Sequence, residues 1–242
     1  MNRVAIYLTN TDRTAFAARH ESDAQKVINR LRGAGAQYDF DVYDVTEDHF
    51  ASDPTAYDGV ILTGSPAFVD DGHGWIEHLM QDIRRLAAAR TPLIGLCFGH
   101  QAIAAALGGR VARRDFWLFG AVDFTVTAER RWMQPPATAL RLYAANRAQV
   151  SALPEGFDLL GGSSDCPIAL SAKGDHILTT QFHPEMDDAF IAELVAEYAD
   201  ALGPEAAARA RDSLRRPAEG ALFGRWMRAF LELPRPGIQS KK

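Results

Sequence analysis

Short apolar runs alternate with amphipathic segments through the first half of the chain. A short apolar run bounded by turn residues is typical of a buried strand, and apolar positions at helical spacing are typical of a covering helix. Buried strands are predicted at residues 4–8, 38–42, 57–63 and 92–96. Helices are predicted at residues 20–32, 75–89 and 101–107. This alternation predicts an α/β fold with a mostly parallel central sheet flanked by helices.

The pattern changes after residue 109. Short strands separated by turn residues indicate an additional antiparallel portion, at residues 120–127, 140–144, 158–162, 167–172 and 176–182. From residue 187 the chain has a helical pattern, with helices predicted at residues 189–202, 205–216 and 220–233.

These patterns divide the chain into two parts. Residues 1–186 are predicted to form the α/β domain, and residues 187–242 a C-terminal helical extension packed on it. The last helix has a strongly apolar face that includes Trp226 and Phe230. That face either docks a partner or packs on the chain's own sheet, and we favour packing. Residues 234–242 are predicted to be a frayed tail.

Composition narrows the class of protein. The 242 residues are 47% hydrophobic and 24% charged, which is ordinary for a globular protein. The net charge of -5 gives no reason to expect nucleic acid or an anionic membrane as a partner. No signal peptide is evident at the N-terminus, and no apolar run approaches the roughly 20 residues of a membrane span. We therefore expect a cytoplasmic protein. The two cysteines form no CxxC pair that would indicate zinc, and no metal site is predicted.

Cys97 lies at a point where a strand gives way to a helix. The strand at residues 92–96 ends there, and Gly95 and Gly99 flank the cysteine. Glycines permit a sharp turn and close approach of a substrate. The following helix directs its N-terminus at the sulfur, stabilises negative charge there, and offers backbone N–H groups to an oxyanion. This arrangement is that of a nucleophile elbow with a thiol in place of a hydroxyl.

A thiolate nucleophile needs a proton partner, and that partner needs an orienting group. His183 and Glu185 are the candidates, because they follow a predicted strand and Pro184 constrains the turn between them. Alone, Cys97 would be interpreted as a small buried hydrophobe. The flanking glycines and the His-x-Glu pair favour a catalytic cysteine instead. Cys166 has no such neighbours and is interpreted as structural.

Two motifs carry a resemblance to a known family. Gly-Leu-Cys-Phe-Gly-His-Gln at residues 95–101 and Gln-Phe-His-Pro-Glu at residues 181–185 resemble the class I glutamine amidotransferases, which use a Cys-His-Glu triad. The resemblance covers about residues 4–185 and is to free-standing members of the GMP-synthase-glutaminase or γ-glutamyl peptidase kind. It implies a flavodoxin-like amidotransferase fold and no metal or organic cofactor.

The resemblance also implies roles for individual residues. Cys97, His183 and Glu185 would form the catalytic triad. The oxyanion hole would use the backbone N–H of Phe98 and that of either Gly64 or Ser65. Gln101 would hold the α-amino and carboxylate end of the substrate.

Three positions depart from the pattern of many relatives. Ser65 stands where they have a second glycine, Leu118 where they have an acidic residue, and Asn146 where they have a histidine. Substrate or partner preference can therefore differ from theirs.

The expected activity is hydrolysis of the γ-amide of glutamine or a γ-glutamyl compound through a Cys97 thioester. The substrate is then a small molecule, and the product is glutamate with ammonia or an amine. One alternative is a glutaminase subunit that delivers ammonia to a synthetase partner, and a homo-oligomer is also compatible with the sequence. A further alternative is a non-catalytic binding or regulatory module on the same scaffold.

Overall fold

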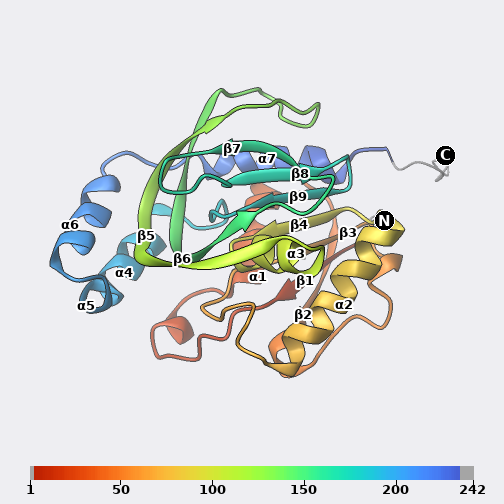
Figure 1. The fold of residues 1–242 in the computed structure, drawn as a ribbon, viewed down its shortest axis with the longest axis horizontal. Coiled ribbons are helices and arrows are strands. Elements are labelled where there is room, and N and C mark those ends of the chain that lie inside the picture. The colour runs from red at the N-terminus through yellow and green to blue at the C-terminus, as the bar shows by residue number, and fades with distance from the viewer. Residues whose placement is uncertain (1–2, 235–242) are drawn as a thin grey trace.

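A single sheet runs through the molecule. The computed structural model describes residues 3–234 (Figure 1). The strands in this part of the chain are β1 (Arg3–Leu8), β2 (Asp39–Asp44), β3 (Gly59–Leu62), β4 (Leu93–Leu96), β5 (Arg110–Val126), β6 (Ala139–Ala152), β7 (Asp158–Gly162), β8 (Leu170–Lys173) and β9 (Ile177–Thr180). Their order across the sheet is β2-β1-β3-β4-β9-β8-β7-β5-β6.

Helices cover the sheet and its far edge. They are α1 (Asp23–Gly33), α2 (Gly74–Ala89), α3 (Phe98–Ala106), α4 (Asp188–Glu197), α5 (Ala199–Leu202), α6 (Pro204–Ser213) and α7 (Gly220–Leu231). Three short 3-10 turns accompany them, η1 (Ala17–Arg19), η2 (Val45–Glu47) and η3 (Pro54–Ala56). The prediction of an α/β protein with a central sheet between helices is confirmed.

The sheet changes character at β9. Strands β2, β1, β3, β4 and β9 pair in parallel, whereas β9 with β8, β8 with β7, β7 with β5 and β5 with β6 pair antiparallel. The antiparallel portion expected from the sequence is therefore a continuation of the same sheet. In the parallel part, Leu62 pairs with Gly95, and Leu96 pairs with Thr180. The carboxyl ends of β3, β4 and β9 thus lie side by side, where parallel sheets place their ligands.

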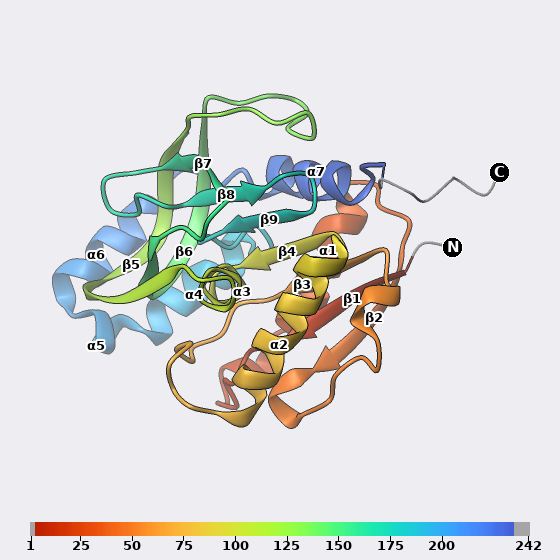
Figure 2. The same ribbon diagram turned by 45° about the vertical axis from the view of Figure 1, so that its right-hand side comes forward.

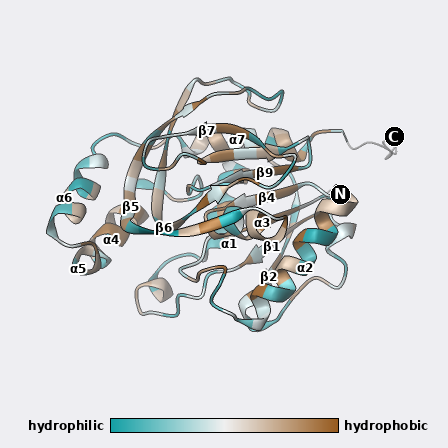
Figure 3. Ribbon diagram, in the orientation of Figure 1, coloured by the Kyte–Doolittle hydropathy of each residue, from teal (hydrophilic) through white to brown (hydrophobic). Residues whose placement is uncertain are grey.

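Two apolar layers hold the helices to the sheet. Side chains alternate between the faces of a strand, so Tyr7 and Leu62 pack with α2 and α3, whereas Ile6 and Ile61 pack with α1 and α7. Figure 2 shows α2 in front of the sheet and α7 on its other side. Hydrophilic and hydrophobic residues follow one another along α2 (Figure 3), as expected of a helix with one face in water.

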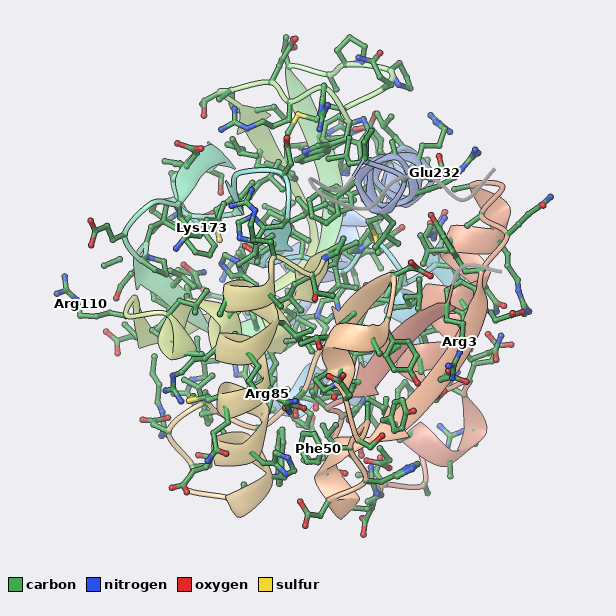
Figure 4. All side chains as sticks on the ribbon, turned by 90° about the vertical axis from the view of Figure 1, so that its right-hand side faces the viewer. Arg3, Phe50, Arg85, Arg110, Lys173 and Glu232 are labelled. Carbon is green, nitrogen blue, oxygen red and sulfur yellow. The ribbon has the colours of Figure 1, made fainter. Side chains whose placement is uncertain are left out.

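Helix α7 is part of the main core. Trp226 and Phe230 are fully buried, and the Trp226 indole N–H donates to the carbonyl of Pro135 at 2.9 Å. Figure 4 looks along α7, with Glu232 at the end nearest the viewer and side chains packed around the helix. These two aromatic side chains are therefore not available to a docking partner.

Strands β5 and β6 are much longer than predicted. β5 starts at Arg110 and β6 reaches Ala152, so the two form a long antiparallel ribbon. The added part of β5 carries Arg113 and Arg114 and has no alternation of apolar and polar residues for a sequence pattern to reveal. The register shifts between Arg113 and Leu118, and such irregularities redirect side chains.

The C-terminal extension continues directly from the sheet. Helices α4 to α6 lie beside β5 (Figures 1 and 2). The division at residue 187 stays a prediction. Residues 1–2 and 235–242, with most of the predicted tail, lie outside the described residues.

Candidate active site

Cys97 has a strained backbone at the junction of β4 and α3. Its φ is 49° and its ψ is -102°, a conformation that residues with a side chain rarely adopt. The Cys97 N–H donates to the carbonyl of Thr180 at 2.9 Å, and its carbonyl accepts from the N–H of Gln101 at 3.1 Å. α3 begins at Phe98, three residues earlier than predicted, so the cysteine directly precedes the helix. The predicted strand-to-helix turn at Cys97 is thus present.

Two glycines make this turn possible. A Cβ at Gly95 would lie 2.6 Å from the Ile103 side chain and 2.7 Å from the Gly99 backbone. A Cβ at Gly99 would lie 2.6 Å from the Leu62 carbonyl oxygen. Real Cβ atoms do not approach so closely. Both positions therefore need glycine so that α3 can pack directly on β3 and β4.

His183 is held from both its backbone and its side chain. Its N–H donates to the carbonyl of Tyr143 at 2.8 Å, which forms an isolated antiparallel bridge to β6. Its Nδ1 is 2.6 Å from Oε1 of Glu185, and both residues are buried. This contact orients the ring, which lies near Cys97, since both residues border Gly64 and the Cys97 sulfur acts on the charge of His183. The structure thus brings the three predicted triad residues together.

Electrostatics favour the charged imidazole. Burial acts to lower the pKa of His183, but the Glu185 carboxylate and the Cys97 sulfur outweigh it and raise that pKa well above its ordinary value. The balance of these interactions favours the protonated imidazole. In contrast, burial raises the pKa of Cys166 to about 12, so the second thiol stays protonated at neutral pH.

The turn after β3 lies against the same pair. A Cβ at Gly64 would lie 2.7 Å from Cε1 of His183 and 3.6 Å from the Cβ of Cys97. Gly64, a predicted oxyanion-hole residue, therefore lies beside Cys97 and His183, and Ser65 lines the same cleft. Phe98 is the first residue of α3, and the first turn of a helix leaves its N–H groups without intrahelical partners. Whether Gly64 or Ser65 supplies the other donor stays open.

Gln101 has contacts that the sequence did not predict. It is buried, and its Nε2 donates to the carbonyl of Ala148 at 2.8 Å and to Oε1 of Gln181 at 3.2 Å. Nε2 of Gln181 in turn lies 3.6 Å from the Cys97 sulfur and donates to it. Sequence reasoning missed this role of Gln181, and its place two residues before His183 was the available signal. The role of Gln101 in substrate binding stays a prediction.

These groups open into a cleft of about 380 Å³. Its lining includes Cys97, His183, Gly64, Ser65 and Gln101. Asn146 also lines it and donates from Nδ2 to the carbonyl of Ala148 at 3.1 Å.

The departures at positions 118 and 146 have different consequences. Leu118 is buried in the core, whereas its neighbours Trp117 and Phe119 line the cleft, because successive side chains of a strand face opposite ways. Asn146 therefore lines the cleft, whereas Leu118 does not.

Within residues 3–234, no group of three or more His, Cys, Asp or Glu side chains is arranged to hold a metal ion. No helix in that part of the chain has the length and hydropathy needed to cross a membrane.

The sequence is similar to a known protein family and to individual known proteins. Residues 19–189 match the model of the family described as glutamine amidotransferase class-I. The chain is 26% identical over 203 residues to γ-glutamyl peptidase 3 of Arabidopsis thaliana, with 80% of each protein covered. It is 32% identical over 131 residues to a glutamine-hydrolyzing GMP synthase subunit of Halobacterium salinarum, covering 53% of this chain and 67% of that protein.

The fold has a counterpart among solved structures. A glutamine amidotransferase from Thermotoga maritima superposes with a TM-score of 0.74 at 18% identity, covering 96% of this chain and 99% of that one. With most of the chain matched by the family model, this protein belongs to the class I glutamine amidotransferase family.

Proposed function

We propose that this chain hydrolyses the γ-amide of glutamine or of a γ-glutamyl compound, with Cys97 as the nucleophile. The observation that carries the proposal is the strained elbow of Cys97 beside His183, whose ring Glu185 holds at 2.6 Å. Family membership supports the same activity. So do the names of two relatives, a γ-glutamyl peptidase and a glutamine-hydrolyzing GMP synthase subunit.

The first half of the reaction forms a thioester. The Cys97 thiolate attacks the γ-carbonyl carbon, and the N–H of Phe98 together with that of Gly64 or Ser65 stabilises the resulting oxyanion. His183 donates its proton to the leaving nitrogen as the C–N bond breaks. Ammonia or an amine departs, and the γ-glutamyl group stays on sulfur.

The second half releases glutamate. Neutral His183 takes a proton from a water molecule, which attacks the thioester carbonyl. The oxyanion collapses, the C–S bond breaks, and the thiolate returns beside the protonated imidazole. Glu185 touches no substrate atom in this scheme and acts by orienting and charging His183.

The test is glutamate release by the purified chain, supplied with glutamine and a panel of γ-glutamyl amides. Cys97→Ala is expected to lower kcat/KM by at least about 1,000-fold, because the covalent route is lost. Cys166→Ala is the matched control, since it removes the other thiol, which lies outside the cleft, and should keep turnover. Turnover that survives in Cys97→Ala would refute the mechanism.

A glutaminase that works with a synthetase partner is the second candidate, favoured by the likeness to the GMP synthase subunit of Halobacterium salinarum. The chain also covers only 34% of the GMP synthase of Psychrobacter arcticus, to which it is 27% identical.

Stoichiometric labelling of Cys97 by an electrophilic glutamine analogue, without glutamate release, would favour this second candidate. Absence of both labelling and release would indicate a non-catalytic module. Homo-oligomerisation and a cytoplasmic location stay predictions.

A further inference from the structure

Part of the cleft is lined by apolar side chains for which the proposed reaction has no use. They come from the loop before η1, from β5, and from α4 with its C-terminal end, and they belong to one apolar cluster. We call them the aromatic wall, and they are Phe16, Trp117, Phe119, Phe190, Leu194 and Tyr198.

The rings of the aromatic wall support one another. The ring centroids of Trp117 and Tyr198 are 5.8 Å apart, and those of Phe119 and Tyr198 are 5.4 Å apart. Phe16 and Phe190 form a second pair at 5.9 Å. These separations are typical of stabilising aromatic pairs. The wall is therefore formed in advance and does not need a ligand to assemble it.

The wall is not simply buried core. Trp117, Phe190 and Tyr198 are only partly buried, and all three line the same cleft as Cys97 and His183. Partly buried aromatic rings that line a cavity of about 380 Å³ are typical of a ligand site, since such pockets run from roughly 300 to 1,000 Å³ and are lined mostly by hydrophobic and aromatic side chains.

The chemistry of a γ-glutamyl amide decides which part of the molecule can pack against the aromatic wall. The glutamyl part carries a charged α-amino group and a charged α-carboxylate, which apolar rings do not stabilise by burial. The ammonia released from glutamine is small and polar. Only the amine portion of a substituted amide can present a large apolar surface.

We propose that the preferred substrate is a γ-glutamyl amide whose amine carries an aromatic or similarly bulky apolar body, seated on the aromatic wall. This inference rests on the proposed function and names the substrate class of the same site. Glutamine itself leaves the wall empty and is therefore a poorer substrate.

The first test compares two substrates on the unmodified enzyme. γ-Glutamyl-ethylamide and γ-glutamyl-(2-phenylethyl)amide share the same scissile bond and release primary alkylamines, so they differ in the phenyl ring. We expect kcat/KM to be at least about tenfold higher for the phenylethyl amide, the scale on which apolar pockets discriminate.

The second test measures whether variants of the aromatic wall change the preference for the phenylethyl amide. Tyr198→Ala and Trp117→Ala should each lower the ratio of kcat/KM between the phenylethyl and ethyl amides by about tenfold. Phe116→Ala is the matched control, because Phe116 neighbours Trp117 on β5, is 38% exposed and does not line the cleft. It should leave the ratio unchanged.

The outcomes separate this inference from the proposed function. Equal kcat/KM for the two amides, with hydrolysis that depends on Cys97, would overturn the inference and leave the proposed function standing. A preference that survives in both wall variants would also overturn the role given to the wall. If no γ-glutamyl amide is hydrolysed in a Cys97-dependent way, both the proposed function and the inference fail.

Discussion

The charge on His183 results from two opposing effects at one residue. Burial disfavours the imidazolium, whereas the Glu185 carboxylate at 2.6 Å and the Cys97 sulfur favour it. The electrostatic effects win, so the pKa of His183 is raised. The raised pKa favours the protonated imidazole, whose proton the proposed mechanism gives to the leaving amine, and this proton is lost as the pH rises through that raised pKa.

Replacing Glu185 by Gln removes the charge that holds this pKa up. The pKa of His183 should then fall, so the alkaline limb of the pH profile of kcat/KM should move to lower pH. We also expect kcat to drop by about 100-fold or more, because general acid catalysis is impaired. Steady-state rates between pH 5 and 10 measure both effects.

The same substitution at Glu205, which is exposed on α6, serves as the control and should leave the profile unchanged. An alkaline limb of Glu185→Gln that coincides with that of the native enzyme would contradict the role given to Glu185.

At the scale of elements, the site depends on three strand ends and one helix that meet closely. β3, β4 and β9 are neighbours in the sheet, and their parallel pairing brings Gly64, Cys97 and His183 to one edge. Gly99 lets α3 approach β3, and its N–H donates to the carbonyl of Thr63 at 3.1 Å. A small change in this packing would move the nucleophile and an oxyanion donor together.

Gly99→Ala tests that packing. The new Cβ would lie 2.6 Å from the Leu62 carbonyl oxygen and 2.7 Å from the Leu62 Cβ, so the backbone must shift. We expect a loss of about 1–3 kcal/mol in the free energy of unfolding. kcat/KM should fall by about 100-fold, because a displacement near 1 Å at the site is this costly. Urea unfolding and steady-state kinetics measure the two effects.

Gly74→Ala is the matched control, since Gly74 begins α2 and no atom lies within 4 Å of its added Cβ. It should change the free energy of unfolding by no more than about 0.5 kcal/mol. Equal effects of the two substitutions would mean that Gly99 is not a close-packed position.

At the scale of the whole molecule, the C-terminal extension joins both the core and the cleft. α7 packs on α1 at Gly224, which lies against the Arg30 side chain. The fully buried Trp226 and Phe223 of α7 belong to the main apolar cluster. α4 and its C-terminal end contribute Phe190, Leu194 and Tyr198 to the cleft. Residues after 186 therefore contribute to the stability of the fold and to the surface that meets a ligand.

Trp226→Ala separates these two contributions. It removes a fully buried side chain that packs on Trp132 and donates to the Pro135 carbonyl. We expect the free energy of unfolding to fall by about 3–5 kcal/mol. kcat/KM per folded molecule should stay unchanged, because Trp226 does not line the cleft. Urea unfolding followed by circular dichroism, with kinetics at low temperature, measures both.

Leu159→Ala, at a residue 44% exposed on β7, is the surface control and should cost no more than about 0.5 kcal/mol. If Trp226→Ala also cost no more than about 0.5 kcal/mol, that result would contradict the place of α7 in the core.

The sequence alone was enough for features that depend on residues close together in the chain. The spacing of Gly95, Cys97 and Gly99 predicts the elbow, because a strand-to-helix turn is determined locally by backbone freedom. The strand-helix alternation likewise predicts the α/β sheet, because each buried strand needs an apolar run and each covering helix an apolar face.

Only the tertiary structure decided what depends on distant segments. The contact of Gln181 with the Cys97 sulfur follows from the pairing of β9 with β4. The full length of β5 and β6 depends on the hydrogen bonds between these two strands. The exposed part of β5 has no alternation of apolar and polar residues from which its length could be predicted. The aromatic wall brings together side chains from Phe16 to Tyr198. A local sequence pattern cannot predict such a surface, because each of these residues taken alone indicates only a buried core position.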